Sequence, residues 1–168
     1  MPNRMDSMMS RGAGMMKGVK ARLDGLTGVF RTLAEQHGEV SAMLKRLQSK
    51  PEKKAELWPE IRRELLSHER GEMREVYPVL RQYVQTRALA EHHDQEAAEL
   101  ERLIERIDAA PTGDWQGLVD ELVDTVLHHA NEEESDIFPK AQEAIGEQAA
   151  RELDARFLTA KKQAATMA

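Results

Sequence analysis

Two stretches of this chain share the same layout of histidine, glutamate and proline. In each stretch a glutamate follows a histidine by four residues, and a proline comes six residues after the glutamate. The two sets are His68, Glu72 and Pro78, and then His129, Glu133 and Pro139. Residues four apart share one face of an α-helix. Both stretches therefore predict helices that carry ionisable side chains on a face whose other residues are apolar.

The composition favours helices along the whole chain. Of 168 residues, only 10 are glycine and 6 are proline, while alanine, leucine, glutamate, arginine and lysine abound. The clearest break is DAAPTGD at 108–114, which holds a proline, a glycine and a candidate N-cap. Five helical segments are predicted: 15–48, 54–83, 86–109, 115–145 and a shorter one over 147–163. Pro78 and Pro139 fall late in their helices and should kink or loosen them.

An internal repeat divides the chain into two halves. Residues 33–47 (LAEQHGEVSAMLKRL) align without gaps on residues 89–103 (LAEHHDQEAAELERL), and each copy precedes one of the two histidine–glutamate stretches. Each half therefore resembles a helical hairpin that supplies one histidine from its first helix and a histidine with a glutamate from its second. Short connections favour antiparallel neighbours, so we expect an all-α fold, an up-down-up-down four-helix bundle with a short additional C-terminal helix.

Helical phase selects which polar residues point toward the interior. Six lie on stripes of leucine, isoleucine and valine: His37, His68, Glu72, His93, His129 and Glu133. Two further histidines form His-His pairs with members of this set. His92 and His128 lie with acidic and polar residues on faces that should meet solvent. Phase and repeat register thus pick the same member of each pair.

A single histidine on an apolar stripe is more often a hydrogen-bonded core residue than a ligand, and an isolated HxxxE pair is often a simple helix-surface interaction. Here four histidines and two glutamates converge at repeat-related positions, and burying two carboxylates without compensation is very costly. A cation offsets that cost, and imidazole with carboxylate is a suitable ligand set. Six donors are too many for one tetrahedral site. The pattern therefore favours two metal ions side by side.

The segments EQHGEV, SHERGEMREVYP, EHHDQE and HHANEEESDIFP together resemble the hemerythrin-like HHE cation-binding family over about residues 20 to 160. The resemblance implies a four-helix bundle around a non-haem di-iron centre with a bridging carboxylate and an oxo or hydroxo group. It carries metal-ligand roles onto the residues at the matching motif positions: His37, His68, Glu72, His93, His129 and Glu133. Two iron ions are the implied cofactor.

The sequence departs from the oxygen-carrying members of that family at one position. Those proteins have a further histidine one turn after the ligand of the third helix, and Ala97 stands there in this chain. One iron then lacks a ligand or takes another. Glu69, directly after His68, resembles an extra carboxylate ligand of some family members, and Glu96 is a weaker candidate. Di-iron binding is therefore better supported than reversible oxygen carriage.

Two function classes stay open, and a third is weaker. In the first, the protein binds, stores or senses iron, dioxygen or a related diatomic ligand without turnover. In the second, it is an enzyme that consumes peroxide or oxygen by redox cycling, as a peroxidase, a catalase-like enzyme or an oxidase. The third is a structural bundle that holds adventitious zinc. No substrate pocket can be delineated from the sequence, and binding is the preferred interpretation.

Charge and composition exclude several other classes. The net charge is −6, which argues against a nucleic-acid or anionic-membrane partner, and the absence of cysteine removes disulfides and thiolate sites. No signal peptide or membrane span is recognised, so a cytoplasmic location is expected. Residues 1–12 are expected to be mobile, ahead of a single domain over 13–165. A stripe formed by Met15, Met16, Val19, Leu23, Leu26 and Phe30 predicts either core packing or a homodimer contact.

Overall fold

The computed structural model describes residues 4–168, with the side chains of 9–17, 20, 21 and 24–168. Within these residues the protein is all-helical, as predicted. Its elements in chain order are α1 (Arg4–Leu23), α2 (Gly28–Ser49), a 3-10 turn (Pro51–Lys53), α3 (Lys54–Gly71), a π-helical turn (Glu72–Val76), α4 (Tyr77–Leu80), α5 (Arg87–Ala109), α6 (Thr112–Glu132), a second π-helical turn (Glu133–Ile137) and α7 (Phe138–Ala165).

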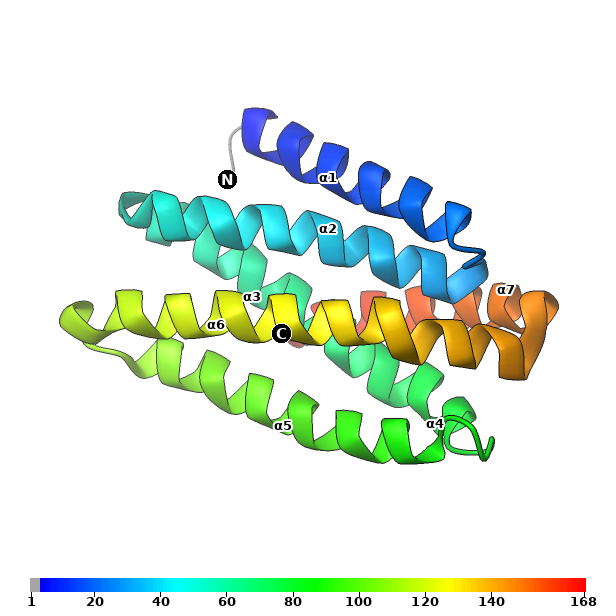
Figure 1. The fold of residues 1–168 in the computed structure, drawn as a ribbon. Coiled ribbons are helices and arrows are strands. Elements are labelled where there is room, and N and C mark those ends of the chain that lie inside the picture. Colours follow the sequence, from blue (N-terminus) through cyan, green and yellow to red (C-terminus); the bar gives the residue numbers. More distant parts are fainter. Residues whose placement is uncertain (1–3) are drawn as a thin grey trace.

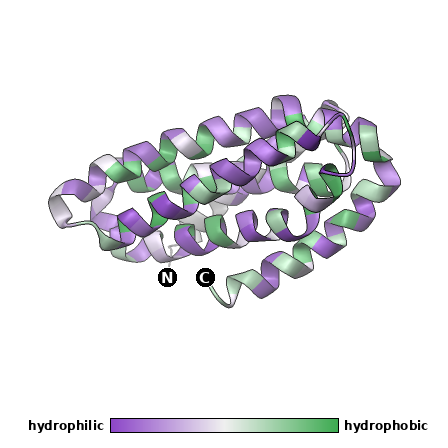
Figure 2. Cartoon of the chain, turned by 90° about the horizontal axis from the view of Figure 1, so that it is seen from below, coloured by the Kyte–Doolittle hydropathy of each residue, from purple (hydrophilic) through white to green (hydrophobic). Residues whose placement is uncertain are grey.

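Four long helices surround the interior of the molecule. Contacts link α2 with α3, α3 with α5, α5 with α6, and α6 back to α2. Helix α1 lies along α2, and α7 packs against α2 and α3 (Figure 1). Hydrophilic and hydrophobic residues alternate along the helices, which is typical of amphipathic segments (Figure 2). Two additional helices, α1 and α7, therefore cover the first half of the repeat, and they contact the second half less.

The apolar core is divided into two clusters by a polar layer. One cluster packs Trp58 and Trp115 with leucines and isoleucines from α2, α3, α5 and α6, and the other packs Phe30, Tyr77 and Phe138 with residues that include those of α7. Along α2 and α5, and along α3 and α6 with the π-helical turns and helices that follow them, the predicted histidine separates members of one cluster from members of the other. The polar residues are therefore held between two apolar masses that shield them from water.

The two prolines loosen their helices, as predicted. Pro78 and Pro139 lack the N–H that would donate to the carbonyl of the residue four positions earlier. The preceding residues widen into the π-helical turns Glu72–Val76 and Glu133–Ile137. Each of these turns begins at one of the two motif glutamates. Single π-helical turns are frequent at functional sites.

The N-terminal part of the fold differs from the prediction. The expected helix over 15–48 is interrupted at 24–27, where Gly25 has a φ of 84° and Thr27 serves as the N-cap of α2. Helix α1 begins at Arg4, so the predicted boundary between residues 12 and 13 falls inside it; the mobility of residues 1–12 stays a prediction. Glycine adopts a positive φ without the penalty that other residues incur, which explains the break.

The predicted Met-rich stripe is only partly buried. Leu26 and Phe30 lie in the core, whereas Met15 and Met16 are exposed. The side chains of Val19 and Leu23, which belong to the same stripe, lie outside the described residues. Core packing is therefore the wrong interpretation for the two methionines, and a homodimer contact stays a prediction.

The predicted break before the C-terminal helix is confirmed at Gly146. The label α7 covers Phe138–Ala165, but Gly146 has a non-helical conformation with a φ of 82°, so the segment consists of two helices that meet at a kink. The bend turns the second part of α7 back onto α2 and α3, where Leu153 and Phe157 are buried. No helix among residues 4–168 combines the length and apolarity that crossing a lipid bilayer requires.

Candidate metal centre

The structure brings the six predicted donors into one layer. Each of α2, α3, α5 and α6 supplies one histidine, and each π-helical turn supplies its first residue as a glutamate. The side chains of Glu72, His93 and Glu133 are fully buried, and those of His37, His129 and His68 are 4%, 11% and 13% exposed. Helical phase thus identified the inward-facing residues correctly.

Two groups of donors share this layer. The first contains His37, His68, Glu72 and Glu133, and the second contains Glu69, Glu72, His93 and His129. Within each group, one donor atom from every residue lies within 4.8 Å of the others, so each group could hold a metal ion. Because Glu72 belongs to both groups, its carboxylate lies between the two candidate ion positions.

Glu133 also links the two groups. Its carboxylate lies 3.1 Å from His37 Nε2, 3.4 Å from His93 Nε2 and 3.6 Å from His129 Nε2. Two glutamates from different halves of the chain thus approach histidines of both groups.

Glu69 completes the second group. It is buried, and its two oxygens lie 3.1 Å from His93 Nε2 and 3.7 Å from His129 Nε2. The sequence predicts Glu69 as a candidate ligand outside the main set of six donors. The signal was its i,i+3 relation to Glu72, which places the two carboxylates on neighbouring parts of one helix face. Ala97 is buried and offers no side-chain donor.

The inward-facing donor atoms make no hydrogen bonds within the protein. They are the Nε2 atoms of His37, His68, His93 and His129, Oε1 of Glu69, both oxygens of Glu72, and Oε2 of Glu133. An unsatisfied buried polar group costs about 1–3 kcal/mol, and a charged one costs more. Several of these atoms approach one another within 4 Å without hydrogen-bond geometry. This concentration of unpaired donors is what a bound cation would resolve.

The outward-facing ring nitrogens have partners at three of the four histidines. Nδ1 of His37 lies 2.9 Å from Glu134, Nδ1 of His68 lies 2.9 Å from Gln36, and Nδ1 of His129 lies 3.3 Å from Glu96. These are the contacts that orient a histidine whose other nitrogen binds a metal. Glu96 therefore contacts the outward nitrogen of His129 and belongs to neither group of donors.

Two of these partners are themselves fixed by lysines. Glu134 pairs with Lys17 of α1 at 2.7 Å, and Gln36 accepts a hydrogen bond from Lys161 of α7 at 2.8 Å. The two added helices thus hold the groups that orient the histidines of α2 and α3.

Aromatic rings support the remaining orientations. Tyr77 stacks on His93 with ring centroids 3.5 Å apart, and its hydroxyl donates to Glu133 Oε1 at 2.5 Å. Phe138, the repeat-equivalent of Tyr77, stacks on His37 at 5.9 Å. Each half therefore places a ring against the histidine supplied by the first helix of the other half.

The nearby carboxylates raise the pKa of three histidines in the metal-free protein. Burial lowers these pKa values, but contacts with the glutamates outweigh it. The pKa rises to about 9 at His37, about 11 at His93 and about 9 at His129. His68 behaves differently, because burial and the charge of His37 lower its pKa well below the usual value.

The shared carboxylates have opposite protonation tendencies. Burial, reinforced by the charges of Glu133 and Glu69, raises the pKa of Glu72 well above its usual value. The pKa of Glu133 is instead lowered well below the usual value, because His129 and His37 outweigh the effect of burial. Such divergent pKa values in one buried cluster are typical of a functional site.

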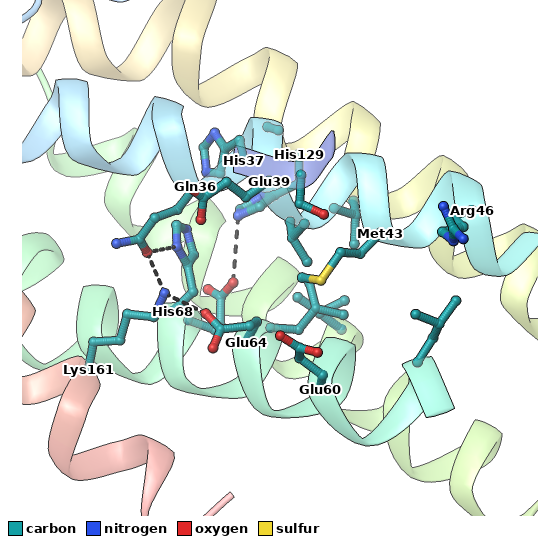
Figure 3. Close-up of a pocket in the computed structure, with 18 of the residues that line it drawn as sticks. Gln36, His37, Glu39, Met43, Arg46, Glu60, Glu64, His68, His129 and Lys161 are labelled. Carbon is teal, nitrogen blue, oxygen red and sulfur yellow. Dashed lines mark hydrogen bonds and ion pairs between the residues drawn. The ribbon is translucent and has the colours of Figure 1, made fainter. Parts of the chain in front are cut away.

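A cavity of about 230 Å³ reaches the first group from outside. His37, His68 and His129 lie on one side of it and Arg46 on the other (Figure 3). Apolar side chains such as Met43 line the passage, together with charged ones such as Glu64 and Lys161, which form an ion pair at 2.9 Å. The sequence pattern does not predict this cavity, because side chains from α1, α2, α3, α5, α6 and α7 form it together.

Comparison with known proteins gives one family and one curated relative. The family model described as the hemerythrin HHE cation-binding domain matches residues 15–141. A protein from Nostoc sp. (strain PCC 7120 / SAG 25.82 / UTEX 2576) that carries the name DNA nickase is 27% identical over 131 residues. The aligned region is 76% of this chain and 37% of that protein, so the chain spans well under half of its length. No solved structure matches the chain significantly.

Proposed function

The chain belongs to the hemerythrin HHE cation-binding domain family, and from that premise we propose that it is a non-haem di-iron protein that binds dioxygen or a related small ligand. The observation that carries this proposal is the set of buried donor atoms without hydrogen bonds. Folding leaves them unpaired in the interior, and bound cations are the partners that the donor types suit.

The proposed ligand sets follow the two groups. His37 and His68 would hold one ion and His93, His129 and Glu69 the other, with Glu72 and Glu133 shared between them. The ions would supply redox capacity and positions for a small ligand. The protein's own part is to fix the imidazoles through Glu134, Gln36 and Glu96, and to exclude bulk water by burial. Imidazole and carboxylate also suit zinc, so the donor types alone do not select the metal. Iron is therefore proposed from the family.

We propose the up-down-up-down bundle as the arrangement that delivers these ligands. The order of packing, α2 with α3, α3 with α5, α5 with α6 and α6 with α2, supports it. In such a bundle each helix contributes donors to the same layer, which is how metal sites are built in helical bundles.

The cavity beside the first group keeps a second function open, a di-iron enzyme that consumes peroxide or oxygen. Its volume of about 230 Å³ exceeds what a diatomic ligand fills. The Glu64–Lys161 pair on its wall offers hydrogen-bonding groups to a polar ligand such as peroxide. Binding without turnover is the preferred function, because Tyr77, the further ionisable side chain that the described residues place at the layer of donors, already donates its hydroxyl to Glu133.

The similarity to a DNA nickase does not extend the proposal to nucleic acids. The matched region is only 37% of that protein, and the net charge of this chain is −6. DNA binding relies on lysine and arginine neutralising phosphates. A nicking activity is therefore not proposed for this chain.

Elemental analysis of the protein purified from its own cells, combined with its absorption spectrum, tests the proposal. Two iron ions per chain are expected, and one ion or fewer in a fully loaded protein would contradict it. The same sample separates the two functions. A stable adduct formed in air supports binding, whereas rapid catalytic loss of added peroxide supports the enzyme.

A further inference from the structure

The outward members of the two His-His pairs come together on the surface formed by α5 and α6. His92, Glu96 and Glu132 each offer one donor atom, and these atoms lie within 4.8 Å of one another. We call these three residues the outer cluster. His128 lies beside it, with Nε2 3.7 Å from Glu132 Oε2. The buried centre uses neither outward histidine as a donor.

Within the described residues, Glu96 connects the outer cluster to the buried centre. One oxygen of Glu96 lies 3.3 Å from His129 Nδ1, and the other lies 3.5 Å from His92 Nε2. The carboxylate therefore faces a buried histidine on one side and the outer cluster on the other.

Two further observations point to a ligand at this place. Glu132 Oε2 is shielded from solvent and makes no hydrogen bond, although the side chain as a whole is 31% exposed. A hollow of about 340 Å³ is lined by Glu96, His128 and His129, so open space adjoins one member of the outer cluster and one donor of the buried centre. The Glu132 oxygen without a hydrogen bond and the open space beside Glu96 suit a hydrated cation.

We propose that the outer cluster is a binding site for a divalent transition-metal ion and that it passes this ion to the buried centre through Glu96. One imidazole and two carboxylates, completed by water, suit ions such as Mn²⁺ and Fe²⁺. The site binds more weakly than the buried centre, because its donors are partly exposed and fewer. The binding site itself is independent of the proposed function, whereas the transfer role rests on it.

Manganese titration of the iron-loaded protein tests the binding site. Free Mn²⁺ is followed by electron paramagnetic resonance, and one additional bound ion per chain is expected. His92→Ala and Glu132→Gln should each weaken this binding at least about tenfold, since even the loss of a residue that only orients a ligand has that effect on a metal site. Glu99→Gln is the matched control, because Glu99 lines the same hollow outside the outer cluster. No additional ion, or equal binding in all variants, would overturn the site.

The rate of iron loading tests the transfer role. Metal-free protein is mixed with Fe²⁺, and the growth of the absorption of the filled centre is followed in time. Glu132→Gln should fill more slowly than wild type and Glu99→Gln, yet reach the same final iron content. Equal rates would overturn the transfer role.

The same Mn²⁺ titration of the Glu72→Gln protein distinguishes failure of the two proposals. If the buried centre of the wild-type protein holds no iron, the proposed function fails. The additional Mn²⁺ ion bound by the Glu72→Gln protein still shows whether the outer cluster binds metal. Loss of the additional ion together with intact iron binding overturns only the outer cluster as a metal site.

Discussion

The two halves of the repeat match on their inner faces and differ on their outer faces. His68 and Glu72 in the first half correspond to His129 and Glu133 in the second, and all four lie in the donor layer. Outside that layer, Gly71 of the first half corresponds to Glu132 of the second. A Cβ at Gly71 would lie 2.8 Å from the ring of Phe157 on α7, whereas Glu132 lies in the outer cluster. At this position the glycine of the first half leaves room for α7, whereas the second half has a polar side chain.

The difference also explains an asymmetry among the histidines. Glu134 of the second half accepts from His37 Nδ1, but the equivalent residue of the first half is Met73, whose side chain has no oxygen. His93 Nδ1 correspondingly makes no hydrogen bond. The repeat therefore fixes the positions of the donors, while the residues behind them determine how firmly each donor is held.

The strongest destabilisation is expected when position 71 of the first half receives the glutamate that the second half has at the equivalent position 132. Gly71→Glu should destabilise the protein by about 3–5 kcal/mol, because it buries an unpaired charge against Phe157. The reverse change, Glu132→Gly, should cost only about 1 kcal/mol of helix propensity. Chemical denaturation of both variants measures the difference. Similar losses in the two would show that the outer faces are not distinguished by α7.

Substitution of the His-His pairs compares inner with outer residues inside one half. His93→Ala and His129→Ala should each lose metal, whereas His92→Ala and His128→Ala should retain the two tightly bound ions. The inner rings are 0% and 11% exposed, and the outer rings are 56% and 76% exposed. Metal analysis after gel filtration checks all four variants. Loss of tight metal from an outer variant alone would refute the phase argument.

Glu69 tests the one difference within the donor layer itself, since the second half has Ala130 at the equivalent position. Glu69→Ala should weaken the ion beside His93 and His129 while leaving the ion beside His37 and His68 in place. A stepwise metal titration should then show one tight and one weakened site. Two unchanged sites would remove Glu69 from the ligand set.

The pH dependence of the metal-free protein should follow its histidines. The folded-state pKa is raised to about 9 at His37 and His129, and to about 11 at His93, from an unfolded value near 6.5. Groups with a raised folded pKa stabilise fully below the unfolded pKa, and that stability is lost as pH rises toward the folded pKa. The free energy of unfolding should therefore fall by at least about 1 kcal/mol between pH 6.5 and 9.

Metal binding should reverse this trend. Protons compete with the ion for the same nitrogens, so the affinity for metal should increase over the same range of pH. Urea unfolding at several pH values, with and without metal, measures both effects. A free energy of unfolding of the metal-free protein that rises above pH 6.5 would contradict the raised pKa values of the three histidines.

The sequence was sufficient to predict the helical class, the inward faces and the loosened turns. Each depends on a local rule: helix-forming composition, a period of 3.6 residues, or the missing N–H of Pro78 and Pro139. The ligand roles of the six donors stay predictions. Burial of His37 and His93, and exposure of His92 and His128, agree with the phase argument on which those roles depend.

What the sequence did not predict depends on packing between distant segments. The turn signals at Gly25 and Thr27 were present, but the apolar stripe continued through them and suggested one helix. The inward direction of Glu69 could be established only once α5 and α6 were in place opposite α3. The cavity and the outer cluster likewise arise from helices that meet only in the folded chain.

The most direct test of a shared metal centre is thermal unfolding of wild type and Glu72→Gln, each with and without a chelator. Glutamine keeps the shape of the side chain and removes the charge that the two ion positions share. Bound metal adds about 4 kcal/mol when its free concentration is a thousandfold above the dissociation constant. We expect the substitution to destabilise the metal-loaded protein and to leave the metal-free protein unchanged or slightly more stable. Equal shifts in the two conditions would contradict a metal role for Glu72.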